Sequence, residues 1–287
     1  MAMVENRRFL TVLTHLGLLL GVLVVGFPLY VTVIASTQTA QDIVQNAPMS
    51  LWPGSHFWAN YQTALWGGQS EYGSRIAPAL PMLGISLASA MIIAIGKILI
   101  SLLSAFAIVY FRFPLRSFVF WMIFVTLMLP VEVRIGPTYE VVANFGLIDT
   151  MTGLTLPLIA SATATFLFRQ FFLTVPDELL EAARIDGASP MQFFRDHLLP
   201  LSATSMAALF VIQFTYGWNQ YLWPLLMTTN ESMYPIVLGI KRMLSGGDAA
   251  NEWNVVMATA ILATLPPAAV VLLMQKWFVR GLVDTEK

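Results

Sequence analysis

Lys97 is the residue whose type and position most clearly suggest chemistry. It lies in an apolar run from Leu80 to Tyr110, about 13 and 17 residues from the two ends, or roughly 20 Å of helix. A lysine at that depth in a membrane cannot easily extend its ammonium group to water, and its insertion costs about 2.5–3.5 kcal/mol. We therefore expect Lys97 to face the protein interior or a wet cavity, where it meets an anionic substrate or pairs with a carboxylate such as Glu132.

Glu132 and Arg134 form a second polar group, directly after Pro130. Residues two apart do not share a helix face, so the two side chains are not expected to pair. The planar guanidinium of Arg134 suits a phosphate group. These residues could gate a pathway, bind phosphate or hold a partner subunit, and packing at an interface is the simpler alternative.

A third group combines aromatic rings with polar tips in the run from Trp218 to Trp223. The group includes Trp218, Asn219 and Tyr221, and Gln213 precedes them by one to two helical turns. Taken by themselves, these residue types suit an aromatic belt at the outer membrane surface.

The longest charged interval of the chain runs from Glu181 to Pro200, between two apolar segments. Thr174 is expected to cap a helix that begins near Pro176, with acidic residues in its first turn. Gly187 allows a turn, and the Ser-Pro pair at 189–190 is expected to start a second short helix that ends at His197.

One face of this element is expected to be open to another surface. The small side chains of Ala182 and Ala183 would let that surface approach closely, and Glu181 beside them could pair with a basic group on a partner. An ordinary amphipathic helix at the membrane surface remains the alternative.

Composition explains why so polar a stretch stands out. Of 287 residues, 57% are hydrophobic and 11% are charged, whereas soluble domains carry about 25% charged residues. The bilayer must therefore solvate much of the chain. The net charge of -1 gives no indication of nucleic-acid binding, and no cysteine is present. The three histidines are scattered, so no metal site is expected.

Six membrane spans are predicted, which gives an all-α integral membrane protein. The first is too long for the core of a cleavable signal peptide, which is about 7–15 residues. The spans are Val12–Ala35, Leu80–Tyr110, Ser117–Val133, Gly153–Phe172, Leu198–Met227 and Val255–Val279. This divides the chain into a start with the first span (1–36), a periplasmic loop with short helices (37–79) and a core (80–287) that contains a cytoplasmic loop (174–200) and a tail (280–287).

Basic residues set the expected orientation, because cytoplasmic segments are rich in lysine and arginine. With both termini in the cytoplasm, the inner segments hold Arg7, Arg8, Arg112, Arg116, Arg169, Arg184, Arg195, Lys276, Arg280 and Lys287. The outer segments hold only Arg75, Arg134, Lys241 and Arg242. The charged element then faces the cytoplasm.

The charged element resembles the EAA loop of binding-protein-dependent ABC importer permeases. The resemblance rests on Glu-Ala-Ala at 181–183, Gly187 after three further residues, and Leu-Pro at 199–200. In that family the loop docks on a cytoplasmic ATPase subunit. The resemblance therefore implies ATPase-coupling roles for Glu181, Ala182, Ala183, Asp186, Gly187 and Pro200.

Other runs are similar to the maltose-type permeases within that family. The run from Trp218 to Leu225 resembles their fifth-helix signature, and residues 104–107 and 111–113 resemble the end of their second helix. The first of these resemblances implies that Trp218, Asn219 and Tyr221, with Gln213 before them, line the pathway or its outer gate. Residues 111–116, 129–134, 166–172 and 278–284 resemble permeases of bacterial sn-glycerol-3-phosphate importers. That resemblance implies import of sn-glycerol-3-phosphate, a small anion, and of glycerophosphodiesters.

The resemblance also implies partners in the bacterial inner membrane and on both sides of it. These are a second, homologous permease, an ATPase dimer and a periplasmic substrate-binding protein, which would contact the loop that contains Lys241 and Arg242. The chain has no Gly-x4-Gly-Lys-Ser/Thr loop, so we expect no catalysis and no bound cofactor. ATP and Mg would be bound by the ATPase subunits.

Three alternatives remain open at the level of sequence. One is a similar permease for a neutral sugar or polyol. Another is a membrane enzyme or sensor that works without a motor, and the third is a channel or secondary carrier whose transport needs no ATP.

Overall fold

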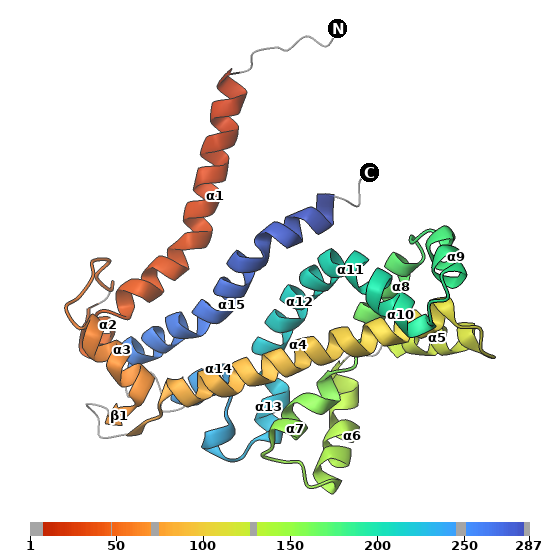
Figure 1. Cartoon of the computed structure of the whole chain (residues 1–287). Coiled ribbons are helices and arrows are strands. Elements are labelled where there is room, and N and C mark those ends of the chain that lie inside the picture. Colours follow the sequence, from red (N-terminus) through yellow and green to blue (C-terminus); the bar gives the residue numbers. More distant parts are fainter. Residues whose placement is uncertain (1–7, 47, 70–74, 127–130, 245–250, 284–287) are drawn as a thin grey trace. The chain divides into compact units, whose positions relative to one another are not determined.

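The computed structural model describes residues 8–46, 48–69, 75–126, 131–244 and 251–283, with the side chains of 8–10, 131–132 and 278–283 excepted. Most of these residues are helical (Figure 1). The chain divides into two compact units. Unit 1 holds residues 1–80 and 240–263, and unit 2 holds 81–239 and 264–287.

Three described helices are long and apolar enough to cross a membrane. They are α1 (Arg8–Ala35), α4 (Ala79–Tyr110) and α15 (Trp253–Val283). Their apolar segments have mean hydropathies of 2.5, 2.5 and 2.2. They match the first, second and sixth predicted spans, and α1 continues through Pro28 because neighbouring groups can compensate for a proline in a membrane helix.

The fourth and fifth predicted spans are each interrupted rather than straight. The fourth combines α7 (Met151–Thr155) and the 3-10 turn η2 (Leu156–Leu158) with α8 (Ala162–Phe172), and the two parts meet at 46°. The fifth includes α11 (Leu199–Leu201), α12 (Ala203–Trp218) and α13 (Leu222–Met227). A bend of 72° separates Pro190–Leu201 from Ala203–Trp218.

The third predicted span is represented by α5 (Arg116–Val125) and α6 (Val131–Asn144), which lie on either side of the undescribed residues 127–130. Counting the bent pairs as single spans gives up to five candidates among the described residues. The number six therefore stays a prediction.

In unit 1, short helices form much of the segment 37–79, as expected for its loop. These are α2 (Ala40–Gln45) and α3 (Phe57–Trp66). An antiparallel pair of short strands that was not predicted, β1 (Gly68–Gln69) and β2 (Arg75–Ile76), follows α3. Asn60 organises this unit, since its Nδ2 donates to the carbonyls of Ser36 and Gln38 at 2.9 and 2.8 Å. Its Oδ1 accepts from Asn254 at the start of α15.

Unit 2 is built around a cluster of phenylalanines. Phe168 and Phe172 of α8 are fully buried together with Phe193, and Phe106 of α4 lies 4.9 Å from Phe194 between ring centres. The cluster joins one end of α4 and α8 to the short helices that follow. A second cluster around Trp223 and Met227 packs beside α6 and α7.

The charged element forms α9 (Asp177–Ile185) and α10 (Pro190–Phe193), and continues as the π-helical turn η3 (Phe194–Leu198). Gly187 makes the turn between them with a φ of 75°, a conformation that glycine adopts without steric cost. The second helix was predicted by its Ser-Pro start. The prediction that Thr174 caps the first helix is wrong. Its hydroxyl donates to the carbonyl of Phe171 at 2.7 Å, and Pro176 occupies the N-cap position.

The remaining described elements complete the loop after α13. They are the 3-10 turn η4 (Glu231–Met233) and α14 (Ile236–Met243). The backbone amide of Ile236 donates to the Ser86 hydroxyl of α4 at 2.8 Å, which holds the beginning of α14 on that helix.

Candidate docking and translocation sites

The exposed surface of α9 and the turn that follows it carry most of the residues predicted to dock a motor. Glu181, Ala182, Asp186 and Gly187 are all exposed, as is Pro200 after the π-helical turn. Two acidic residues in the first turn, Asp177 and Glu178, stand at the positive end of the helix dipole. We call the exposed residues of α9, together with Asp186 and Gly187, the docking surface.

Ala183 does not belong to the docking surface, although its small side chain had been expected there. It is 4% exposed and packs within the phenylalanine cluster. The reason is helical geometry, because the side chain that follows Ala182 points about 100° away around the helix. Ala183 therefore anchors α9, and Ala182 remains the small residue that a partner can approach.

Ile185 is a docking candidate that sequence reasoning missed. It is one of the apolar residues of α9, with Leu179, Leu180 and Ala183, yet 86% of its surface is exposed. It is the last residue of the helix, where the chain turns away from the cluster. Ile185 therefore adds an apolar side chain to an otherwise charged surface.

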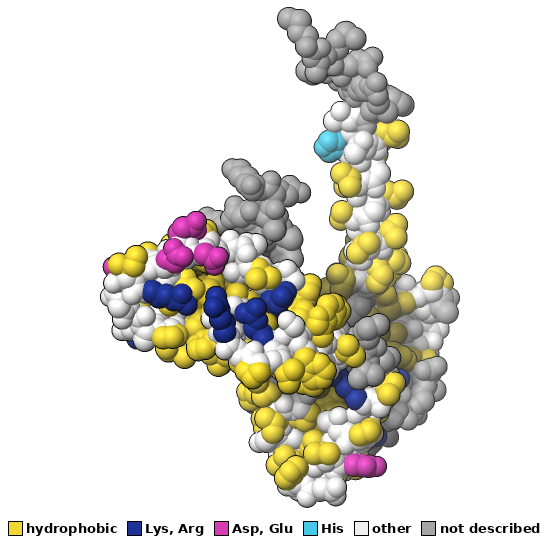
Figure 2. Space-filling model, turned by 90° about the vertical axis from the view of Figure 1, so that its right-hand side faces the viewer, with side chains coloured by type: hydrophobic (Ala, Val, Ile, Leu, Met, Phe, Trp, Pro, Cys, Tyr) yellow, Lys and Arg dark blue, Asp and Glu magenta, His cyan; other side chains and the backbone are white. Residues whose placement is uncertain are grey.

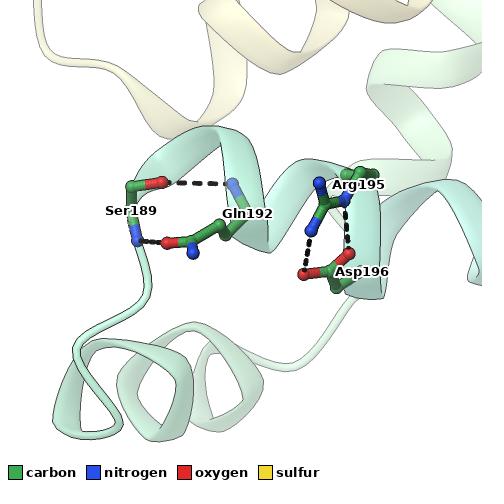
Figure 3. Close-up of polar contacts among 4 residues, drawn as sticks. All are labelled: Ser189, Gln192, Arg195 and Asp196. Atoms are coloured by element: carbon green, nitrogen blue, oxygen red, sulfur yellow. Dashed lines mark hydrogen bonds and ion pairs between the residues drawn. The ribbon is translucent and has the colours of Figure 1, made fainter.

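The second helix of the element is fixed by local hydrogen bonds (Figure 3). The Ser189 hydroxyl accepts from the backbone of Gln192 at 3.3 Å, and the Gln192 side chain accepts from the backbone of Ser189 at 2.7 Å. This reciprocal pair is a capping box. Further along, the Arg195 guanidinium donates to both carboxylate oxygens of Asp196, at 2.7 and 3.1 Å.

Lys97 lies inside unit 2, as its depth in the second span predicted. Lys97 is buried, with 6% of its surface exposed. Its Nζ donates to Oε1 of Gln213 at 3.0 Å and lies 3.5 Å from the ring centre of Tyr216. Both partners belong to α12 and are three positions apart, so they share one helix face. The structure thus joins two predicted path residues, Lys97 and Gln213. Tyr216 was missed, although its spacing from Gln213 was a usable signal.

Small residues allow α4 and α12 to approach closely enough for this contact. A Cβ atom added at Gly217 would lie 2.9 Å from the Cα of Ala90. Such a distance is shorter than real Cβ contacts, so Gly217 is required for the close packing of these two helices. The buried hydrogen bond of Lys97 depends on that packing.

A cavity of 340 Å³ adjoins this site. Tyr216 belongs to both, because its ring lies under the Lys97 ammonium group and also lines the cavity. Predicted path residues Asn219 and Tyr221 line the cavity too, with further amide and hydroxyl groups from Gln220 and Thr138. Such a mixture of aromatic faces and hydrogen-bonding groups suits a small polar ligand.

The other predicted path residues lie differently. Trp218 is 2% exposed, stacks on Phe214 at 5.9 Å between ring centres, and does not line the cavity. Arg134 is exposed on α6. The side chain of Glu132 is outside the described residues, so its expected pairing with Lys97 stays a prediction.

Asp149 holds together the two loops that flank this cavity's helices. Its carboxylate accepts hydrogen bonds from the backbone and hydroxyl of Thr229 and from the backbone of Asn230. These bonds lower the pKa of Asp149 below its ordinary value, with the Thr229 hydroxyl as the largest cause. Trp223 adds a bond from its indole nitrogen to the carbonyl of Gly153 at 3.1 Å.

No group of three or more His, Asp or Glu side chains that could hold a metal ion occurs among the described residues. The site chemistry visible in this part of the chain is that of a buried cation, an amide and aromatic hydroxyl groups.

Residues 97–284 match the family described as the binding-protein-dependent transport system inner membrane component. The chain is 61% identical over 286 residues to the sn-glycerol-3-phosphate transport system permease protein UgpE of Agrobacterium fabrum. It is 60% identical over 285 residues to the protein of the same name from Pectobacterium atrosepticum. Each alignment covers 99% of this chain and 100% of the relative.

The fold is similar to that of a chain in a solved structure, a bacterial ABC transporter involved in the import of the acidic polysaccharide alginate. The TM-score is 0.77 at 18% sequence identity, with 97% of this chain and 99% of that chain covered. At that identity the likeness concerns the fold alone. The chain therefore has the helical fold of an ABC importer permease.

Proposed function

Because the chain belongs to the binding-protein-dependent transport system inner membrane component family, we propose that it is a permease subunit of an ATP-driven importer of sn-glycerol-3-phosphate and glycerophosphodiesters. The single observation that carries the substrate is the identity of 61% to a permease of that name over nearly the whole chain. The chain is a multi-pass membrane protein of the bacterial inner membrane.

The proposed topology has six spans with both termini in the cytoplasm. It is supported by the distribution of lysine and arginine, which is heavily weighted to one set of segments. Residues 37–79 then form a periplasmic segment, and α9 and α10 face the cytoplasm. The core from residue 80 onward carries the loop 174–200 and the tail 280–287.

Lys97 is the residue we propose for recognition of the substrate phosphate. Its present partners are a neutral amide and an aromatic ring, and neither neutralises its charge. A phosphate oxygen could replace Gln213 as the acceptor and form a charge-assisted hydrogen bond, which is stronger than a neutral one. The polyol part of the substrate would then contact Tyr216, Asn219 and Tyr221 in the adjoining cavity.

The proposed energy source is a pair of ATPase subunits that bind ATP and Mg, since this chain has no phosphate-binding loop of the Gly-x4-Gly-Lys-Ser/Thr type. One ATPase would meet the docking surface, and its movement would pass through the phenylalanine cluster to α4 and α8 as a rigid-body shift. The pathway would form between this chain and a second permease. A binding protein would deliver the substrate from outside.

The proposal is tested by uptake into proteoliposomes that contain the whole complex. We expect ATP-dependent accumulation of radiolabelled sn-glycerol-3-phosphate and little accumulation of glycerol or a neutral disaccharide. Uptake without ATP would indicate a carrier or channel. Equal uptake of a neutral polyol would instead support an importer of neutral sugars.

The role of Lys97 is tested in the same assay with Lys97→Met, and with Lys276→Met as a control on the exposed surface of α15. We expect the concentration of the phosphate ester that gives half-maximal uptake to rise about tenfold to a hundredfold. That is the effect of losing one charge-assisted hydrogen bond. The control should behave as the unmodified complex does. Normal uptake by Lys97→Met would remove Lys97 from the substrate site.

A further inference from the structure

A second cavity, of 370 Å³, lies at the end of α8 that leads into the charged element. Its walls come from the last turn of α4, the first turns of α5 and the second half of α8. Arg116 and Arg169 line it together with the polar side chains of Ser117 and Gln170, and none of its described lining residues is acidic. The cavity therefore presents positive charge that no carboxylate in its lining neutralises.

Arg169 is held in a defined position while part of its hydrogen-bonding capacity is unused. Its guanidinium carbon lies 4.1 Å from the centre of the Phe120 ring, a cation–π contact that holds the group against the ring. Its Nε is buried and has no hydrogen-bond partner in the structure. A buried donor without a partner is costly, so a ligand that supplies an acceptor oxygen would be bound favourably.

The remaining walls of the cavity are apolar, and they continue onto an exposed apolar surface that can contact lipid acyl chains. Phe120 and Phe124 line the cavity with Phe166, Trp121 and Leu173. Trp121 and Leu173 are 58% and 54% exposed. Trp121 lies in the second turn of α5, and tryptophan is enriched at the level of the lipid headgroups. On one face of the molecule, Figure 2 shows a row of Lys and Arg side chains with hydrophobic side chains around it and Asp and Glu side chains close by.

We propose that this cavity binds the headgroup phosphate of an anionic phospholipid of the inner leaflet. The two guanidinium groups would hold the phosphate, since a planar fork matches its oxygens. The acyl chains would lie along the exposed apolar side chains of α5. A free phosphate ion shares the first interaction and lacks the second. The assignment to the inner leaflet rests on the proposed function, because it depends on the proposed orientation of the chain. The binding of a phosphate by the two arginines does not depend on that function.

The experiment uses the whole complex, purified and reconstituted in nanodiscs of defined lipid, and native mass spectrometry after gentle release. We expect phosphatidylglycerol to stay bound in preference to phosphatidylcholine. Arg169→Gln and Arg116→Gln should each lower its retention about fivefold, as expected for one basic residue at an anionic surface. Arg75→Gln, the same charge change on the β2 strand of unit 1, should leave retention unchanged.

Two results would overturn the proposal. Equal retention of phosphatidylglycerol in the unmodified complex and in both arginine variants is one. Displacement of the bound lipid by millimolar inorganic phosphate is the other, because it would identify a site for the free ion. Arg116 is exposed, so its variant should assemble even if Arg169→Gln does not. Lipid retention is read without substrate, so its outcome is separate from the transport assay.

Discussion

Lys97 and Gln213 lie 116 positions apart in the chain, and one hydrogen bond of 3.0 Å joins the ammonium group of the first to the side-chain oxygen of the second. The contact brings together α4 and α12, two helices of unit 2. It satisfies one of the three ammonium protons of a buried lysine and leaves its charge without a counterion in the described contacts of Lys97.

We predict that Gln213→Leu destabilises the complex because it leaves the Lys97 ammonium group without its acceptor. The cost should be about 1–3 kcal/mol, as for a buried polar group that loses its partner. Thermal unfolding in detergent measures it. In the double variant with Lys97→Met most of the stability should return, since both polar groups are then absent. Additive losses would show that the two side chains are not coupled.

Ala182 and Ala183 should respond in opposite ways to a large side chain. Ala183→Phe should lower stability by about 1–3 kcal/mol, because extra volume strains a packed core and Ala183 is 4% exposed. Ala182→Phe should leave thermal unfolding unchanged and weaken recovery of the ATPase subunits in a pull-down. The two measurements together separate packing from docking. Loss of ATPase recovery at normal stability in Ala183→Phe would contradict the assignment.

Asp149 should make stability depend on pH at the acidic end. Its folded-state pKa is lower than its ordinary value of 3.8, chiefly because of the hydrogen bond from Thr229. The stability it contributes is therefore fully present above pH 3.8 and is lost as pH falls through the folded-state value. Acid unfolding of the purified complex should show this loss.

The matched variant is Asp149→Asn, which keeps the shape of the side chain and removes its charge. It should be less stable at neutral pH than the unmodified chain, and the difference should shrink as the pH is lowered below 3.8. A difference that stays constant down to strongly acidic pH would contradict the role of the carboxylate.

Hydropathy was enough to predict the three longest helices, because about 20 apolar residues in a row have few other stable arrangements. The Ser-Pro pair at 189–190 also predicted α10, the second helix of the charged element. Ser189 and Gln192 have the spacing of a capping box, and the structure contains both of its hydrogen bonds. Gly187 makes the turn that was predicted there, with a positive φ.

The features that sequence could not supply depend on contacts between distant segments. The direction of Ala183 is set by phenylalanines from α4, α8 and α10, and helical spacing alone does not reveal which face they cover. Thr174 had a side chain suited to an N-cap, yet the helix begins three residues later. The stacking of Arg169 on Phe120 joins α8 to α5 and has no signature within either segment.

The contrast between the buried Ala183 and the exposed Ile185 of α9 has a mechanical consequence. Ala183 is clamped among aromatic rings, while Ile185, two residues later, is almost wholly bare. A force applied at Ile185 would therefore reach α4 and α8 through closely packed side chains, and a flexible hinge would not absorb it. A partner bound at Ile185 would act only about 3 Å along the helix axis from the packed Ala183.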